Sequence, residues 1–258
     1  MSRRLGVALG SGVAWLALLG IWWLIAALEN HPGTLWPAPA QVGSALWQLR
    51  GALAQNAATT VQEAALGFGA AVALAVAIAL ASERYRPLAA SLHQLAIGVY
   101  SLPLIALAPV LVLWTGSGLT TKVIIAALAS FFPVLINLTQ ALRTTDPQAL
   151  ELMRVAGASS WQVFRCVELP YALPALFAAF TIAAPAAILG AMLAEWVGAN
   201  SGLGIQLLNS MQNGDVPQLY ACLAVASALS LAAWLAFTLL GRLLFPWHAS
   251  LQPAERRA

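Results

Sequence analysis

The segment 143–169 carries the most informative spacing of charged and turn-forming residues in the chain. Asp146 precedes Pro147, and this pair predicts a helix start, because aspartate caps free backbone N–H groups and proline suits the first helical position. The helix is predicted to end at Gly157, where the missing side chain allows a sharp turn. A second short helix, capped by a serine (159 or 160), is predicted to follow and to end at the Leu169-Pro170 step. Such a pair of charged helices favours contact between proteins.

The apolar side chains of this segment are more numerous than a solvated loop needs. They are Leu150, Met153, Val155, Trp161, Val163 and Phe164. An exposed surface of this kind indicates a partner. The two short helices are therefore predicted to form a knob that docks onto another protein.

The histidines, serines, lysine and cysteines of the sequence do not form a known catalytic or metal-binding motif. The histidines at 31, 93 and 248 lie outside or at the edges of the apolar segments, and no serine lies in a Gly-x-Ser-x-Gly motif. The single lysine, Lys122, follows Thr121, so the Gly-Lys pair of a phosphate-binding loop is absent. Two cysteines predict neither a disulfide framework nor a zinc site. The net charge of +3 is spread along the chain, which argues against nucleic acid. We predict a chain that is not an enzyme and has no metal or cofactor of its own.

The composition identifies lipid as the solvent. Of the 258 residues, 61% are hydrophobic and 8% are charged, whereas soluble domains carry roughly 25% charged residues. A membrane-spanning helix needs about 20 apolar residues, and charge-free runs predict an all-α protein with about six such helices in a single domain, 1–258. The predicted spans cover about 5–28, 64–82, 94–114, 123–142, 173–194 and 218–241. The first apolar run is longer than the roughly 7–15 residues of a signal peptide, so it is predicted to remain as an anchor.

Lysine and arginine predict the orientation, because cytoplasmic loops are enriched in both. With six spans, ten of these residues fall on the side of the two termini, and only Arg50 and Lys122 fall on the other. The ten are Arg3, Arg4, Arg84, Arg86, Arg143, Arg154, Arg165, Arg242, Arg256 and Arg257. Both termini are therefore predicted to be cytoplasmic.

Between the first two spans, apolar residues recur at helical spacing. Val42, Leu46, Leu49 and Leu53 share one face, and tryptophans lie nearby at 36 and 47. The helix is predicted either to lie at the membrane surface or to pack on the other spans.

The loop 143–169 also resembles the EAA motif of ABC importer permeases, which are binding-protein-dependent transport inner-membrane components. The sequence reads Glu151-Leu152-Met153, then Gly157, then Val167-Glu168-Leu169-Pro170, with the spacing of that motif. It departs from the motif at Leu152, Met153 and Val167, each an apolar residue in place of another. The resemblance implies a type I ABC importer permease fold.

Three other stretches are similar to permeases for nitrate, taurine and aliphatic sulfonates. They are Ser101 to Gly116, Phe131-Phe132-Pro133 with Asn137, and Ala194-Glu195-Trp196 with Ser201 to Gly204. This resemblance implies a small, anionic solute. Riboflavin and thiamine-precursor permeases belong to the same broad group and resemble them, so a solute of that kind is the alternative.

The resemblance also implies the partners of the chain and its cellular location. A cytoplasmic ATPase dimer would bind ATP and magnesium, a second permease copy would complete the path, and an extracytoplasmic binding protein would deliver solute at a bacterial inner membrane. The residues expected to couple to the ATPase are Glu151, Met153, Arg154, Ala156, Gly157, Ala158, Trp161, Leu169 and Pro170.

Prolines interrupt the third, fourth and fifth spans, and backbone groups freed in this way must be satisfied by protein or by water in a cavity. These spans are therefore predicted to line the path. The candidate residues are Ser101, Pro103, Ser130, Asn137, Thr181, Pro185 and Glu195. The polar ones could instead bond their own backbone or neighbouring helices. Alanines at 179, 183, 187 and 191 share one face of the fifth span and predict close helix approach.

Two other transport classes compete with this interpretation. An ion-coupled secondary transporter is expected to carry an acid deep in a span, and the charge-free runs contain none there. A channel would fit the span count but would leave the loop 143–169 without a role.

Overall fold

The computed structural model describes residues 17, 20–28, 35–84 and 94–246, and every regular element in these ranges is helical. Residues 20–28 and Gln94–Tyr100 form short helices. The remaining elements are α2 (Pro39–Gln48), α3 (Arg50–Arg84), α5 (Leu104–Thr115), α6 (Leu119–Arg143), α7 (Pro147–Val155), α8 (Ser160–Val163), the π-helical turn η1 (Phe164–Glu168), α9 (Leu169–Glu195), α10 (Leu203–Gln212) and α11 (Val216–Leu244).

Four helical runs in the described ranges are long and apolar enough to cross a membrane: Arg50–Ser82, Leu119–Arg143, Ser160–Glu195 and Val216–Leu244. The pair Gln94–Tyr100 and Leu104–Thr115 counts as a fifth if it forms one span. The predicted first span, 5–28, lies mostly outside the described residues, as do the two chain termini.

The helices extend beyond several of the predicted spans. The largest difference is in α3, which begins at Arg50 although the charge-free run begins at Ala64. The helix begins before the charge-free run because polar residues in its first half, such as Thr60 and Glu63, are buried against other helices.

The predicted span 94–114 is divided into two helices that meet at 92°. The bend falls at Ser101 and Leu102, directly before Pro103, the residue that precedes the first turn of α5. Proline disfavours helical geometry in the residue before it, which explains the position of the break.

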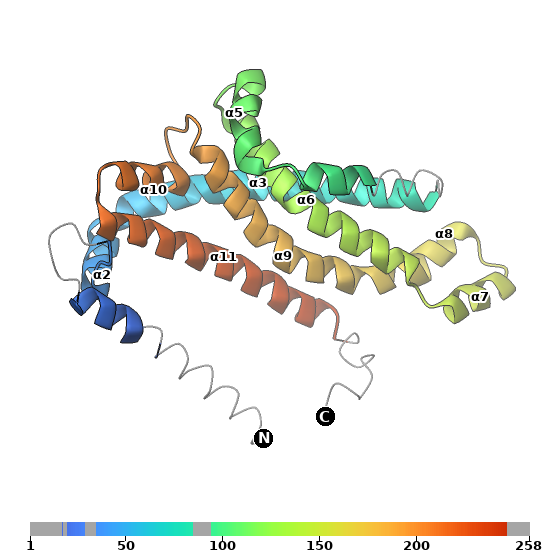
Figure 1. Ribbon diagram of the computed structural model, residues 1–258. Helices are drawn as coiled ribbons and strands as arrows, with labels where there is room; N and C mark the ends of the chain where they lie inside the picture. Colours follow the sequence, from blue (N-terminus) through green and yellow to red (C-terminus); the bar gives the residue numbers. More distant parts are fainter. Residues whose placement is uncertain (1–16, 18–19, 29–34, 85–93, 247–258) are drawn as a thin grey trace, which may run out of the picture.

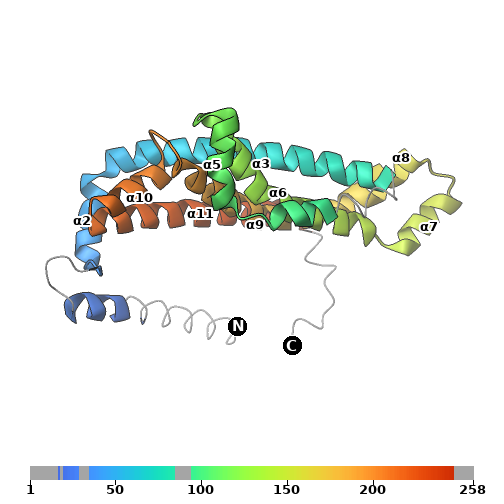
Figure 2. The same cartoon turned by 45° about the horizontal axis from the view of Figure 1, so that its top comes forward.

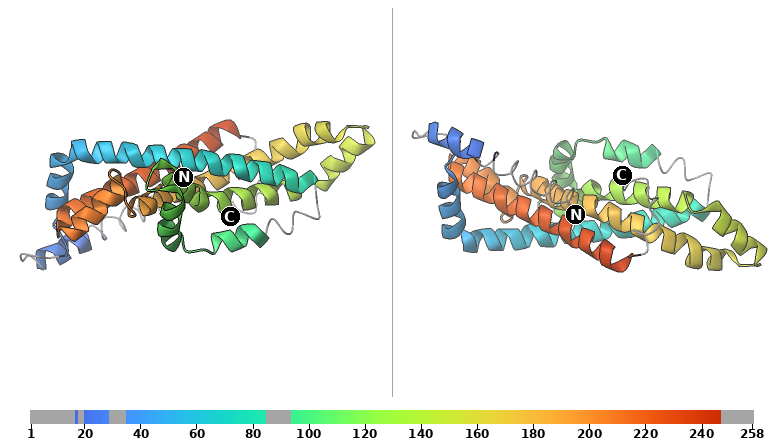
Figure 3. Two further views of the ribbon diagram at one scale, coloured as in Figure 1. Left: turned by 90° about the horizontal axis from the view of Figure 1, so that it is seen from above. Right: turned by 90° about the horizontal axis from the view of Figure 1, so that it is seen from below.

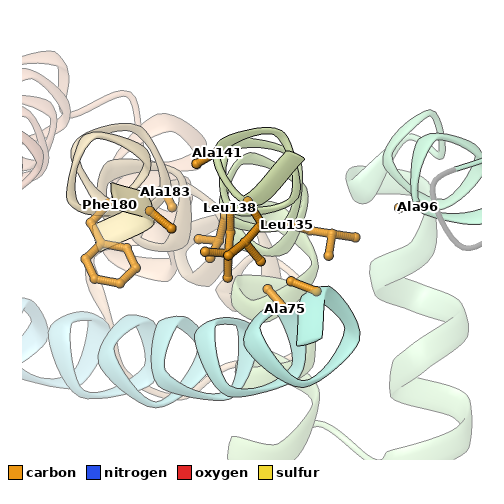
Figure 4. Close-up of a cluster of buried hydrophobic side chains, with 11 residues drawn as sticks. Ala75, Ala96, Leu135, Leu138, Ala141, Phe180 and Ala183 are labelled. Atoms are coloured by element: carbon orange, nitrogen blue, oxygen red, sulfur yellow. The ribbon is translucent and has the colours of Figure 1, made fainter. Parts of the chain in front are cut away.

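The core of the bundle lies on both sides of α6. Leu135 and Leu138 of α6 lie between Ala75 of α3 and Phe180 of α9 (Figure 4). The predicted alanine face of α9 is buried at all four positions, which confirms the expected close approach. Gly190 adds to it, because a Cβ built there would lie 2.8 Å from the Cβ of Ala129.

The molecule is elongated, with α3, α6, α9 and α11 running along its length (Figures 1 and 2). At one end α7 and α8 project beyond the bundle, and α2 and α10 lie at the opposite end (Figure 3). Val42 of α2 and Leu53 of α3 are buried in a cluster with Leu203 of α10 and Ala221 of α11. This agrees with the expectation that the amphipathic segment packs on other helices.

Candidate functional site: an exposed knob and a buried polar network

The first candidate site is the knob, which comprises α7, α8 and the turn between them. The amide of Gln148 donates to Oδ1 of Asp146 at 3.0 Å, which confirms the predicted cap. The helix ends as predicted at Gly157, whose φ is +73°. The amide of Gly157 bonds the carbonyl of Arg154, and the amide of Ala158 bonds that of Met153, each at 3.0 Å. This pair of bonds is a Schellman motif, which favours glycine.

The second knob helix, α8, is capped by Ser159, whose hydroxyl accepts a hydrogen bond from the amide of Gln162. Its predicted end at Leu169-Pro170 is wrong, because the chain continues through η1 into α9 as one helical run. Within η1 the amide of Leu169 bonds the carbonyl of Phe164, five residues earlier. The wider π turn lies directly before Pro170, a residue that has no amide to donate to an α-helical turn.

The knob exposes an apolar surface with charges beside it. Leu152, Val155 and Trp161 are 70%, 83% and 65% exposed, and Glu151 and Arg154 are also exposed. Leu152, which looked like a simple departure from the motif, is thus more exposed than Met153, which is half-buried. The structure therefore leaves an apolar surface with two flanking charges exposed at the knob.

The candidate path residues lie on or next to several different helices. The side chains of Ser101, Ser130, Asn137 and Thr181 each donate to a carbonyl of their own helix, at 2.7–2.9 Å. Pro103 precedes α5 and Pro185 lies inside α9. Each of these four polar residues thus has a bond to its own backbone, and their place along a path stays a prediction.

An apolar groove of about 500 Å³ lies between α3, the helix Gln94–Tyr100 and α6. None of the candidate path residues lines it. Its walls include Leu74, Leu95, Val99, Leu128 and Phe131. Its lining is almost entirely hydrocarbon and therefore offers little polar recognition.

Glu195, by contrast, is the centre of a second candidate site. It is the last residue of α9, and its carboxylate is fully buried. Thr60 of α3 donates its hydroxyl to Oε1 of Glu195 at 2.6 Å, and the amide of Gly204 donates to Oε2. A carboxylate is favourable at the N-terminus of α10, where free amides and the helix dipole attract negative charge.

Close by along α3, Glu63 forms a buried ion pair with Lys122 of α6, with Nζ and Oε1 2.7 Å apart. Oε2 of Glu63 has no hydrogen-bond partner among the described residues. One expectation is corrected here: Lys122, expected in an outer loop, is buried inside α6. The charge-free runs stop at this residue, but its charge is paired with Glu63 and can therefore lie within a helix.

One sequence pattern indicates this buried polar network, which comprises Asn56, Thr60, Glu63, Lys122, Glu195 and Gln206. Asn56, Thr60 and Glu63 follow the spacing i, i+4, i+7, which places them on one face of a helix. All three bond other elements: Oδ1 of Asn56 accepts the amide of Gly202 at 2.8 Å, and its Nδ2 donates to Gln206 at 2.8 Å. A polar face of this kind in an apolar helix indicates contact with other protein, not with lipid.

Comparison with known proteins identifies the family of this chain and several of its relatives. The profile of a family described as "binding-protein-dependent transport system inner membrane component" matches residues 71–254. A riboflavin transport system permease protein of Chloroflexus aurantiacus is 34% identical over 245 residues, 94% of this chain and 91% of its own. A formylaminopyrimidine transport permease protein of Halalkalibacterium halodurans is 30% identical, over 95% and 98% of the two chains. A taurine transport system permease protein of Escherichia coli is 26% identical, over 98% and 93%.

The fold of this chain also resembles that of solved transporter structures. A chain of the methionine ABC transporter MetNI in an inward-facing conformation aligns with a TM-score of 0.59 at 22% identity, covering 76% of this chain and 96% of that one. A chain of an amino acid ABC transporter also aligns with a TM-score of 0.59, at 18% identity, over 77% and 95%. The helical arrangement is that of a type I ABC importer permease.

Proposed function

Because this chain belongs to the family of binding-protein-dependent transport inner-membrane components and is the permease subunit of an ABC importer, we propose that its knob docks into a separate ATPase and transmits ATP-driven motion to the spans. The protein is a multi-pass component of the bacterial inner membrane. Its family works with an ATPase and a binding protein. The ATPase would be a dimer that binds ATP and magnesium, and a second copy of this chain would complete the assembly.

The observation that carries the proposal is the unpartnered surface of the knob. Leu152, Val155 and Trp161 together expose more hydrocarbon than a solvated turn requires. Glu151 and Arg154, one helical turn apart, would add charged contacts beside it. Ala156, Gly157 and Ala158 form the turn, and Leu169-Pro170 joins the knob to α9, so these residues would set its angle.

The solute we propose is an uncharged heterocycle of the flavin or pyrimidine type. The relatives named for riboflavin and formylaminopyrimidine are more similar to this chain than the one named for taurine. The charge distribution supports this choice, because Lys122, the only lysine, is neutralised by Glu63. The second candidate is a small solute with an anionic group, such as nitrate, taurine or another sulfonate, and Lys122 would not be free to bind that group.

Co-purification tests the coupling role. The tagged protein would be purified from its own cells in mild detergent, and the proteins recovered with it identified by mass spectrometry. We expect stoichiometric recovery of a P-loop ATPase, lost in a Glu151→Lys, Val155→Asp variant. The control is Gln148→Lys, an exposed position on the first turn of the same helix. If gentle crosslinking in membranes also finds no ATPase, the importer proposal fails, and a channel or ion-coupled transporter becomes the better explanation.

Uptake distinguishes the two solute classes. Cells that express the importer would be supplied with labelled riboflavin, a labelled pyrimidine or labelled taurine. We expect uptake of a heterocycle that requires an intact knob. Uptake of taurine alone would overturn the choice of solute while leaving the coupling role in place.

A further inference from the structure

Three charged side chains are buried where α3, α6 and α9 meet. Glu63, Lys122 and Glu195 are 2%, 8% and 0% exposed. A single base can balance only one of the two acids, so the cluster carries an excess negative charge when all three groups are ionised. A buried charge without a partner is strongly unfavourable, and proteins avoid it by pairing the group or by neutralising it. The cluster therefore needs one more positive charge than its own side chains supply.

The two acids differ in their hydrogen bonds. Each oxygen of Glu195 accepts one donor, the Thr60 hydroxyl at Oε1 and the Gly204 amide at Oε2. Glu63 accepts Nζ of Lys122 at Oε1, and its Oε2 is buried without a hydrogen-bond partner among the described residues. Leaving a buried acceptor without a donor costs free energy, because its hydration is lost and not replaced. A proton on this oxygen would remove the excess charge and also make a hydrogen bond possible.

The two carboxyl groups are neighbours. Thr60, which donates to Glu195, lies one helical turn before Glu63 on α3. Glu63 and Glu195 are close enough for their negative charges to repel each other when both are ionised. Two carboxylates in one site relieve this repulsion when one of them is protonated. The protonated group then donates a hydrogen bond that the remaining carboxylate can accept.

The groups around the pair do not supply the missing charge. Among the described residues, Lys122 of α6 is the buried cation. The N-terminus of α10 contributes the amide of Gly204 and a partial charge of roughly +0.5, which is smaller than the excess. The buried titratable group of α11, Cys222, lies in the cluster around Leu203, and a protonated thiol carries no charge.

We propose that Glu63 and Glu195 bind one proton between them in the folded protein. The pair then carries one negative charge, which Lys122 balances, and the shared proton bonds α3 to α9 beside the bond from Thr60. In the unfolded chain both acids are hydrated and ionised at neutral pH. Folding therefore takes up one proton, so the stability of the folded state should fall as the pH rises. The site belongs to the folded subunit itself and does not depend on the ATPase or the solute.

The number of protons released on unfolding tests this site. The full chain would be unfolded with guanidinium chloride in mild detergent and weak buffer, and the base needed to restore the starting pH measured. At about pH 6, where free glutamates are ionised, we expect the wild-type chain to release about one proton more than Glu63→Gln or Glu195→Gln. Each amide keeps the shape of the acid but cannot share its proton. Glu151→Gln, at an exposed position in the knob, should release as many protons as the wild type.

The pH dependence of stability is the second measurement. Above about pH 5 the unfolding equilibrium constant of the wild type should rise about tenfold per pH unit relative to that of Glu63→Gln, until the folded pair loses its proton. The Glu63→Gln variant should itself fold, because an amide can donate to Glu195 and accept from Lys122. Equal proton release and equal pH dependence in the wild type and both amide variants would overturn the proposal. Loss of the proton in only one of the two amide variants would overturn the sharing and assign the proton to that residue alone.

Discussion

At the scale of single residues, Lys122 and Glu63 form a buried ion pair in the described part of the chain. Each charge is buried, and each depends on the other for solvation. Removing one partner leaves an uncompensated charge, which is far more costly than removing both.

We therefore predict that Lys122→Met lowers the free energy of unfolding by about 3–5 kcal/mol. The double variant Glu63→Leu, Lys122→Met should recover most of this lost stability. The measurement is the thermal unfolding midpoint in detergent for the two single variants and the double variant. A double variant as unstable as Lys122→Met would show that packing, rather than charge pairing, dominates at this position.

Gly202 is the second residue with a specific prediction. Alanine there meets both an unfavourable φ and the carboxyl group of Glu195, whereas alanine at Gly214, with a φ of +68°, meets open space. We expect Gly214→Ala to cost about 1–2 kcal/mol from the backbone alone and Gly202→Ala to cost clearly more. The thermal unfolding midpoints of the two variants measure this difference. Equal losses of stability would argue against close contact between residue 202 and Glu195.

At the scale of elements, Gly157 determines how α7 ends. The left-handed position is open to side chains but strained for most of them, and asparagine tolerates it best. We expect Gly157→Val to reduce recovery of the ATPase and Gly157→Asn to retain it. Both variants should unfold at the wild-type temperature, because no residue of α7 is buried. If the unfolding temperature of Gly157→Val falls together with the recovery of the ATPase, Gly157 stabilises the helical bundle rather than the contact with the ATPase.

The elements also show where sequence reasoning succeeds and where it stops. The caps at Asp146 and Ser159 and the alanine face of α9 depend on local spacing, and the structure confirms them. The Glu63–Lys122 pair joins residues 59 positions apart, so it depends on how α3 and α6 align. The 92° break before Pro103 and the π turn before Pro170 are marked by proline, but their size depends on packing.

At the scale of the whole molecule, one helical run connects the knob to the polar network. Ser160–Glu195 is 36 residues long, about 54 Å at 1.5 Å per residue. Its first residue lies in the knob and its last accepts the bonds from Thr60 and Gly204. A displacement of the knob can therefore reach α10 through α9, along a helical run that is modified at η1 and at the internal prolines Pro174 and Pro185.

The π turn sets the angle between the knob and the rest of that run. Deleting Arg165 removes the extra residue of the turn, so the knob should rotate about α9 by about 100°, the angle of one helical residue. We expect this deletion to abolish ATP-driven uptake, and Arg165→Ala, which keeps the turn and removes the charge, to retain it. Unfolding temperatures should match, because no residue of η1 is buried. If the deletion variant still transports, the knob does not act through a fixed angle on α9, and the link between the two ends must run through α6 instead.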